Sequence, residues 1–182
     1  MSDTKHSIKA VIGLGNPDPK HYFQRHNIGF RIIDAFVQTY GNGTALWKNK
    51  PAMEICQIVI AEKELTLIKP MTFMNSSGQV IPHLLKTGIQ STEILVIHDE
   101  LEKPFGNISI KIGGSHKGHN GLKSIIQYCG PEFARLRFGI GRPGKKEDVP
   151  EYVLRPFSEP AEQVNQCIEQ AIEALQNYLK EL

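Results

Sequence analysis

Hydrophobic and polar positions follow two rhythms along this chain, one typical of strands and one typical of helices. Six segments show the short apolar runs or the residue-by-residue alternation of strands: Ile8–Gly13, Glu54–Ala61, Leu65–Lys69, Glu93–His98, Asn107–Ile112 and Arg135–Ile140. The second and third of these flank the polar residues 62–64, which predicts a hairpin. The first is almost wholly apolar, so we expect it to be buried.

Three helices are expected between these strands. Residues from about Gly29 to Tyr40 place their large apolar side chains on one face, as an amphipathic helix does. A second helix is expected to run to about Lys86, with Asn75 or Ser76 as its cap. The third follows a glycine-rich loop at residues 113–121.

The clearest helical pattern covers the last stretch of the chain, from about Glu159 to Leu182. Its apolar positions recur at spacings of three and four: Ala161, Val164, Ile168, Ala171, Leu175, Tyr178 and Leu182. We expect this stripe to dock onto the rest of the domain, the alternative being a helix that binds a partner. Strands interleaved with helices, plus one hairpin, predict a single-domain α/β fold: a twisted mixed β-sheet flanked by helices, with an amphipathic helix at the C-terminus.

Length and composition exclude several protein classes. The chain has 182 residues, of which 40% are hydrophobic and 22% are charged, values that suit one globular domain over residues 1–182. No apolar run reaches about 18 residues, so we expect no membrane helix. Residues 1–6 contain no apolar stretch, so we expect no signal peptide. Three cysteines without CxxC spacing indicate buried thiols in a reducing compartment.

The net charge of +2 conceals an uneven distribution. Residues 1–102 are neutral overall, residues 103–146 carry a net charge of +8, and residues 147–182 carry −6. We expect the basic segment to fold with its charges outward. If these charges share a face, they will attract a polyanion through phosphate contacts. The alternative is that they balance the acidic end of the chain.

Three motifs of familiar chemistry are incomplete here. Gly13-Leu14-Gly15 follows a strand as in dinucleotide-binding folds, but the third glycine is missing and prolines follow. Residues Gly113–Gly118 miss the serine-hydrolase pattern G-x-S-x-G by one position. His116 and His119 have the HxxH spacing of metal ligands but lie in a glycine-rich loop. We therefore expect no cofactor and no metal.

The remaining candidates are histidines, a carboxylate and amides at the junctions between elements. His26 lies just before the first helix, and Asp99 lies at the end of a strand, where α/β sheets bind ligands. Asn16, Asn75 and Asn120 lie at three further junctions, either as turn and capping residues or as groups that hold a peptide-like backbone. An imidazole paired with a carboxylate can activate water, and an amide can stabilise an oxyanion. The residues alone indicate a metal-free hydrolase or an anion-binding domain.

Six strings in one chain, in the same order, are shared with a known family. They are Gly13–Pro17, Arg25–Phe30, Lys69–Gly78, His98–Leu101, Gly118–Leu122 and Phe133–Gly144. On these strings the sequence resembles the bacterial-type peptidyl-tRNA hydrolases, from about Ile8 to Phe157. The resemblance implies a single-domain α/β fold, which agrees with the predicted elements.

The resemblance also implies a reaction. These enzymes hydrolyse the ester between the C-terminus of a peptide and the terminal ribose of a tRNA, which recycles tRNA from prematurely released peptidyl-tRNA. They use no metal and form no covalent intermediate. By position in the shared strings, His26 would be the general base on water and Asp99 would orient its ring. Asn16 and Asn75 would hold substrate and water near the reacting carbonyl.

Further positions would contact the substrate. Met74 would shape the peptide channel, and Asn120, with the neighbouring His119, would contact the water or the substrate end. Lys111 and Arg137 would clamp a tRNA phosphate, which agrees with the independent observation of the +8 segment.

The sequence departs from the family pattern in two loops. In the first loop, Asp18 replaces a glycine and His21 occupies the position of a tyrosine that contributes to the substrate site. Tyr22 follows by one residue, so either Tyr22 takes this role or His21 partly substitutes. In the glycine-rich loop, Lys117 stands where the family often has glycine or arginine, which adds positive charge near the expected tRNA path.

Two classes of function remain: the esterase, and a non-catalytic RNA-binding relative with the same fold. The presence of all the implied catalytic residues favours the esterase. We expect a cytoplasmic monomer that acts on peptidyl-tRNA and binds neither membranes nor DNA.

Overall fold

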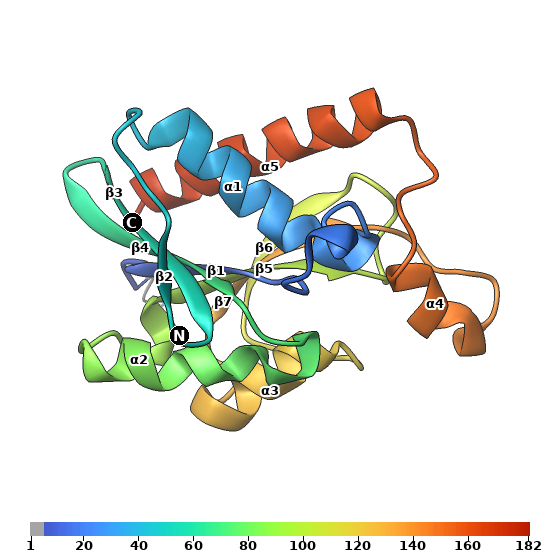
Figure 1. Cartoon of the computed structure of the whole chain (residues 1–182), viewed down its shortest axis with the longest axis horizontal. Helices are drawn as coiled ribbons and strands as arrows, with labels where there is room; N and C mark the ends of the chain where they lie inside the picture. The colour runs from blue at the N-terminus through green and yellow to red at the C-terminus, as the bar shows by residue number, and fades with distance from the viewer. Residues whose placement is uncertain (1–5) are drawn as a thin grey trace.

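A computed structural model describes residues 6–182 (Figure 1), so most of the segment on which the signal-peptide expectation rests lies outside the described residues. The strands are β1 Ala10–Gly13, β2 Lys48–Lys50, β3 Met53–Ile60, β4 Lys63–Pro70, β5 Ile94–Glu100, β6 Ile108–Ile112 and β7 Ala134–Gly139. The α-helices are α1 Ile28–Tyr40, α2 Ile81–Lys86, α3 Asn120–Cys129, α4 Val149–Val153 and α5 Ala161–Lys180.

All seven strands belong to one sheet, in the order β2-β3-β4-β1-β5-β7-β6. Its centre is parallel: β1 pairs with β4 and β5, and β5 pairs with β7. Its edges are antiparallel, with the hairpin β3–β4 and strand β2 on one side and β6 on the other. The predicted mixed α/β sheet and the predicted hairpin are confirmed. The carboxyl ends of β1, β4, β5 and β7 meet at one edge, where such sheets bind ligands.

Helices cover both faces of the sheet, α1 and α5 on one face and α2 and α3 on the other (Figure 1). Successive residues of β1 therefore serve different cores: Val11 packs with the α1–α5 layer, and Ile12 packs with the α2–α3 layer. Val164, Ile168 and Leu175 of α5 are buried in the first of these cores. The expectation that the C-terminal helix docks onto its own domain is confirmed.

The start of the second predicted helix differs from the sequence-based expectation. A 3-10 helix over Met74–Val80 comes first, its N-cap is Phe73, and no side chain caps it. The prediction that Asn75 or Ser76 caps this helix is wrong. Pro82 lies in the first turn of α2, where a proline is tolerated because its missing N–H would be unpaired there anyway. The α-helical part accordingly begins only at residue 81.

Two elements have no counterpart in the predictions: β2, with three residues, and α4, with five. Both are too short for a periodic pattern. The thiol of Cys56 is buried, whereas Cys129 and Cys167 are only half-buried, and all three are free. Along residues 6–182, no helix is both long enough and apolar enough to cross a membrane.

Candidate active site

β1 and α1 approach each other closely where the chain leaves the sheet. A Cβ atom on Gly13 would lie 2.5 Å from the carbonyl oxygen of Gly29, and a Cβ on Gly29 would lie 2.4 Å from the amide nitrogen of Leu14. The glycine at position 13, at the head of the incomplete dinucleotide motif, therefore serves helix–strand packing. This contact places the loop after β1 beside the 3-10 helix Arg25–Asn27, which precedes α1.

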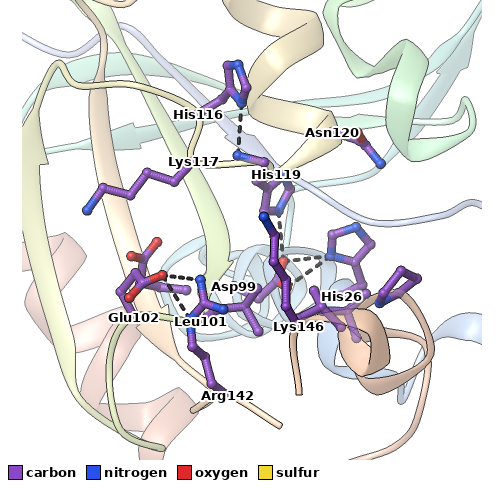
Figure 2. A pocket seen from close by; sticks show the side chains of 15 residues that line it. His26, Asp99, Leu101, Glu102, His116, Lys117, His119, Asn120, Arg142 and Lys146 are labelled. Atoms are coloured by element: carbon purple, nitrogen blue, oxygen red, sulfur yellow. Dashed lines mark hydrogen bonds and ion pairs between the residues drawn. The ribbon is translucent and has the colours of Figure 1, made fainter. Parts of the chain in front are cut away.

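His26 and Asp99 form a buried hydrogen-bonded pair although 73 residues separate them in the chain. Asp99 lies near the carboxyl end of β5, and His26 lies in the 3-10 helix before α1. Nδ1 of His26 is 2.9 Å from Oδ1 and 3.0 Å from Oδ2 of Asp99. Because a carboxylate only accepts, Nδ1 carries the hydrogen, and the lone pair of Nε2 is left free. Figure 2 shows the ring of His26 bonded to Asp99 through the other nitrogen.

A second histidine donates to the same carboxylate. Nε2 of His119 is 2.9 Å from Oδ1 of Asp99, and its Nδ1 accepts from the backbone N–H groups of Gly121 and Leu122. Because Nδ1 is an acceptor, Nε2 carries the hydrogen. His119 is thus the N-cap of α3 and a donor to Asp99 at once. The sequence analysis considered His119 as a metal ligand and as a substrate contact but not as a cap, because histidine is not among the favoured capping residues.

The carboxyl group of Asp99 is 3% exposed. Burial by itself would raise its pKa, but the rings of His26 and His119 beside it hold the pKa of Asp99 well below its usual range. The group therefore stays ionised and acts as an acceptor that orients two imidazole rings.

The neighbouring His98 is fully enclosed and has a different role. Its Nδ1 donates to the backbone carbonyl of Asp99 at 2.8 Å. Burial, and after it the adjacent His119, lowers the pKa of His98 to about 3. His98 is therefore neutral in the folded protein and fixes the backbone of β5 at Asp99.

We expect His98 to make the folded protein less stable toward acid. Its pKa is about 3 when folded and about 6.5 when unfolded. As pH falls below about 6.5, the unfolded chain gains a proton here that the folded chain does not, so the free energy of unfolding decreases. His98→Asn retains a donor near the Nδ1 position and does not titrate. Urea unfolding between pH 6.5 and 4.5 measures how steeply the free energy of unfolding falls with pH. This slope should be smaller for the variant than for the wild type, by an amount equivalent to up to about one bound proton per molecule. Equal slopes in the two proteins would contradict the assignment.

Asn16 connects two loops at this edge of the sheet. Its backbone N–H donates to Oδ1 of Asn27 at 3.0 Å, and Nδ2 of Asn27 donates back to its carbonyl at 2.9 Å. Oδ1 of Asn16 accepts from the backbone N–H of Met74 at 2.9 Å. Asn27 directly follows His26, so these bonds fix the side chain of Asn16 close to His26. Its Nδ2 group is left as a donor.

Asn75 and Asn120 are exposed, and neither caps a helix, because the caps are Phe73 and His119. The capping alternative is therefore wrong for both. Asn120 lines the cavity beside His26. Met74 is buried against α3, where a Cβ on Gly121 would lie 2.6 Å from its sulfur. Phe73 is 77% exposed beside it, a surface aromatic that the sequence analysis passed over.

The first loop is tied to α1 through Tyr22. Its hydroxyl donates to Oδ2 of Asp34 at 2.9 Å, and Lys69 donates to Oδ1 of the same carboxylate at 2.8 Å. Burial, together with the charge of Asp34, raises the pKa of Tyr22. The hydroxyl of Tyr22 is thus engaged within the protein, and a substrate contact by Tyr22 or His21 stays a prediction.

The two residues of the expected phosphate clamp lie on neighbouring strands. Arg137 of β7 pairs with Ser109 of β6, and Lys111 of β6 pairs with Arg135 of β7. Lys111 and Arg137 are therefore diagonal neighbours on one face of the sheet, and both line a small depression that also includes His98. Arg135 is only 3% exposed, so the expectation that the basic segment turns its charges outward is wrong at this position.

Nitrogen and oxygen atoms of His26, Asp99 and His119 lie within 4.8 Å of one another, a spacing that a metal ion could bridge. A coordinating nitrogen must be unprotonated. Nε2 of His119 carries a hydrogen, because its Nδ1 accepts from two backbone N–H groups. These residues therefore suit a hydrogen-bonded relay better than a metal centre.

A cavity of about 310 Å³ opens beside the pair (Figure 2). His26, Asp99 and Asn120 lie on one side of it. Its apolar lining consists of Leu101, Val149, Pro150 and Val153. Three of these four belong to α4, which the sequence analysis did not predict. Arg142 and Glu102, which are bonded to each other, also line the cavity.

Comparison with known proteins agrees with this arrangement. Residues 10–182 match the family model described as Peptidyl-tRNA hydrolase. A peptidyl-tRNA hydrolase of Aquifex aeolicus is 45% identical over 175 residues, which are 92% of this chain and 88% of that protein. One from Roseobacter denitrificans is 41% identical over 152 residues, 83% of this chain but only 64% of that protein. The chain thus spans less than two thirds of the second relative.

Solved structures show the same likeness. The crystal structure of peptidyl-tRNA hydrolase from Acinetobacter baumannii has a TM-score of 0.86 and 37% identity, covering 98% of this chain and 90% of that one. A purine nucleoside phosphorylase from Toxoplasma gondii, at 10% identity and a TM-score of 0.56, shares the fold alone. The motifs, the fold and these matches agree: the chain belongs to the peptidyl-tRNA hydrolase family.

Proposed function

We propose that this chain hydrolyses the ester bond between the C-terminus of a peptide and the terminal ribose of a tRNA, and so recycles tRNA from prematurely released peptidyl-tRNA. The observation that carries the proposal is the buried His26–Asp99 pair beside the 310 Å³ cavity, in a chain of this family. The pair leaves one ring nitrogen of His26 free to act on water.

The reaction needs one base. Nε2 of His26 takes a proton from water while the water oxygen attacks the ester carbonyl carbon. The bond to the ribose oxygen then breaks, and the proton on His26 passes to that oxygen, which releases the peptide acid and free tRNA. Asp99 holds the ring in the required tautomer and stabilises the imidazolium that forms. An alcohol leaves more readily than an amine, so no covalent nucleophile or metal is required.

Amide groups around the pair would hold the substrate. Oδ1 of Asn16 already accepts from Met74, so its Nδ2 donates to the reacting carbonyl or to the peptide backbone. The exposed amides of Asn75 and Asn120 supply further donors and acceptors at the rim. The buried Met74 shapes the peptide channel, and Tyr22 contributes through its ring.

The substrate's RNA part would bind the basic strands β6 and β7. Lys111 and Arg137 clamp a phosphate there, since they are diagonal neighbours on one face. In this proposal residues 1–182 act as one cytoplasmic domain and as a monomer. The domain needs no cofactor and binds no membrane. It binds no DNA, because the reacting ester is on the ribose of an RNA.

A single assay tests the activity. Purified peptidyl-tRNA is incubated with the protein in the presence of a chelator, and the free tRNA is measured. Release with multiple turnovers supports the proposal. Binding without release would favour the non-catalytic RNA-binding alternative. Release that is lost with the chelator and restored by a divalent ion would contradict the metal-free mechanism.

Loss of a clamp residue is expected to weaken tRNA binding more than chemistry. In Lys111→Ala and Arg137→Ala, KM should rise with a smaller change in kcat, since the contact is distant from the ester. Each lost phosphate contact should also reduce the log–log salt slope of binding by about one. Affinity measured over a series of salt concentrations checks this. Unchanged slopes in both variants would rule out the clamp.

A further inference from the structure

One arginine of the basic segment points into the protein rather than toward solvent. Arg135 on β7 is 3% exposed, whereas Arg137, two residues along the strand, is half-buried. The guanidinium of Arg135 also lies 4.6 Å from the centre of the Phe133 ring, which fixes its plane. Burial of a charge is costly, and hydrogen bonds from the guanidinium offset this cost.

Both terminal nitrogens of Arg135 donate to backbone carbonyls of the glycine-rich loop, while the buried Nε has no partner among the described residues. Nη1 donates to the carbonyl of Ser115 at 2.8 Å, and Nη2 donates to that of Gly114. Nη2 also lies 3.4 Å from the carbonyl of Pro131, at the other end of α3. A planar fork of this kind fixes both the position and the direction of its acceptors.

This loop has a backbone that needs such support. Gly113, Gly114, Lys117 and Gly118 have φ values of 70°, 110°, 45° and 85°. Lys117 is a residue with a side chain in the left-handed region, which is unfavourable without support from its surroundings. Arg135 fixes the first half of the loop through its hydrogen bonds to Gly114 and Ser115.

The same loop runs directly into the catalytic centre. Four residues after Ser115 comes His119, which donates to Asp99 and caps α3. Asn120 follows at the rim of the cavity. A displaced loop would therefore move the second donor of Asp99 and a substrate amide together.

We propose that Arg135 is a positioning residue: it holds the glycine-rich loop so that His119 remains bonded to Asp99. The two arginines of β7 thus have different roles: Arg137 contacts the phosphate, and Arg135 fixes the glycine-rich loop. The competing assignment is that Arg135, which also lines the depression, is a third phosphate ligand. The kinetic part of this inference rests on the proposed function.

Arg135→Lys separates the two assignments, because lysine keeps the charge but cannot form the fork. We expect kcat to fall by about 10- to 100-fold, as for a small misplacement of a catalytic group, with little change in the salt slope of tRNA binding. Arg31→Lys, a matched arginine control on α1 whose guanidinium bonds Asn165, should leave kcat unchanged.

A double variant distinguishes a lost His119 contact from a merely weakened fold. His119→Ala removes one of the two donors that hold the carboxylate of Asp99, so its kcat should fall with little change in tRNA binding. If Arg135 acts through His119, Arg135→Lys should lower kcat in the wild-type background but should lower it no further in His119→Ala. Losses of kcat that simply add would indicate a general weakening of the fold.

Hydrogen exchange tests the loop without relying on activity. The amides of residues 113–122 should exchange faster in Arg135→Lys than in Arg31→Lys. If Arg135→Lys does not fold, the neutral Arg135→Gln takes its place in both measurements. Unchanged exchange, additive losses of kcat in the double variant, or a reduced salt slope with normal kcat would each overturn the proposal. If the wild-type protein releases no tRNA, the exchange result still decides the role of the loop.

Discussion

Turnover of peptidyl-tRNA is expected to fall by about 10²–10⁴ in His26→Ala, the usual range for loss of a general base. In the proposed mechanism the lone pair of Nε2 takes the proton from water, because Nδ1 is bonded to Asp99 at 2.9 Å. Affinity for tRNA should change little, since the basic strands β6 and β7 are untouched. Single-turnover rates and binding measured on the same samples check both parts.

The alanine variant also removes a donor from a buried carboxylate, so its stability is expected to fall as well. His26→Asn is the better control, because its amide can donate to Asp99 from near the Nδ1 position but offers no base at Nε2. It should lose as much turnover as His26→Ala with a smaller drop in melting temperature. His83→Ala, on α2 away from the site, controls for loss of a histidine. Near-normal turnover in a folded His26→Asn protein would end the proposed mechanism.

How far the sequence predicts this fold depends on the length of its patterns. α5 spans 20 residues with a continuous apolar stripe, so its existence and its buried face follow from the sequence. β2 and α4 span three and five residues, too few for a hydrophobic periodicity to be recognised. The apolar wall that α4 gives the cavity was therefore beyond prediction.

The candidate site could likewise be predicted only in part. That Asp99 belongs at the ligand-binding edge follows from its place at a strand end. Its bonds to two histidines do not, because they depend on how residues 73 and 20 positions away fold back. The resemblance supplied His26, whereas the role of His119 required the geometry of the loop.

Burial of charge was the least predictable feature. Arg135 and Arg137 alternate on one strand with apolar residues, and nothing in that pattern separates them. Burial of Arg135 depends on the carbonyl groups of Gly114 and Ser115, which a loop with left-handed backbone brings near, and on the Pro131 carbonyl and the Phe133 ring. The residue type predicts the sign of the charge but not whether the side chain is buried or exposed.

Asp99→Asn is expected to lower turnover by about 10²–10⁴ while the protein stays folded. His119 cannot change its tautomer, because two backbone N–H groups hold its Nδ1 as an acceptor. Its Nε2–H therefore holds the single amide oxygen at the position of Oδ1. The amide NH₂ then takes the place of Oδ2, which lies 3.0 Å from Nδ1 of His26. The hydrogen of His26 then moves to Nε2, which leaves no lone pair for water.

This reasoning gives a non-additive result for the double variant. When His119→Ala is combined with Asp99→Asn, the amide oxygen is free to accept from Nδ1 of His26, and the productive tautomer returns. The double variant should then turn over faster than Asp99→Asn alone, although His119→Ala by itself slows the enzyme. Comparing kcat for the wild type, both single variants and the double variant measures the coupling. If the double variant is as slow as, or slower than, Asp99→Asn, competition for one acceptor is not the reason why the carboxylate is needed.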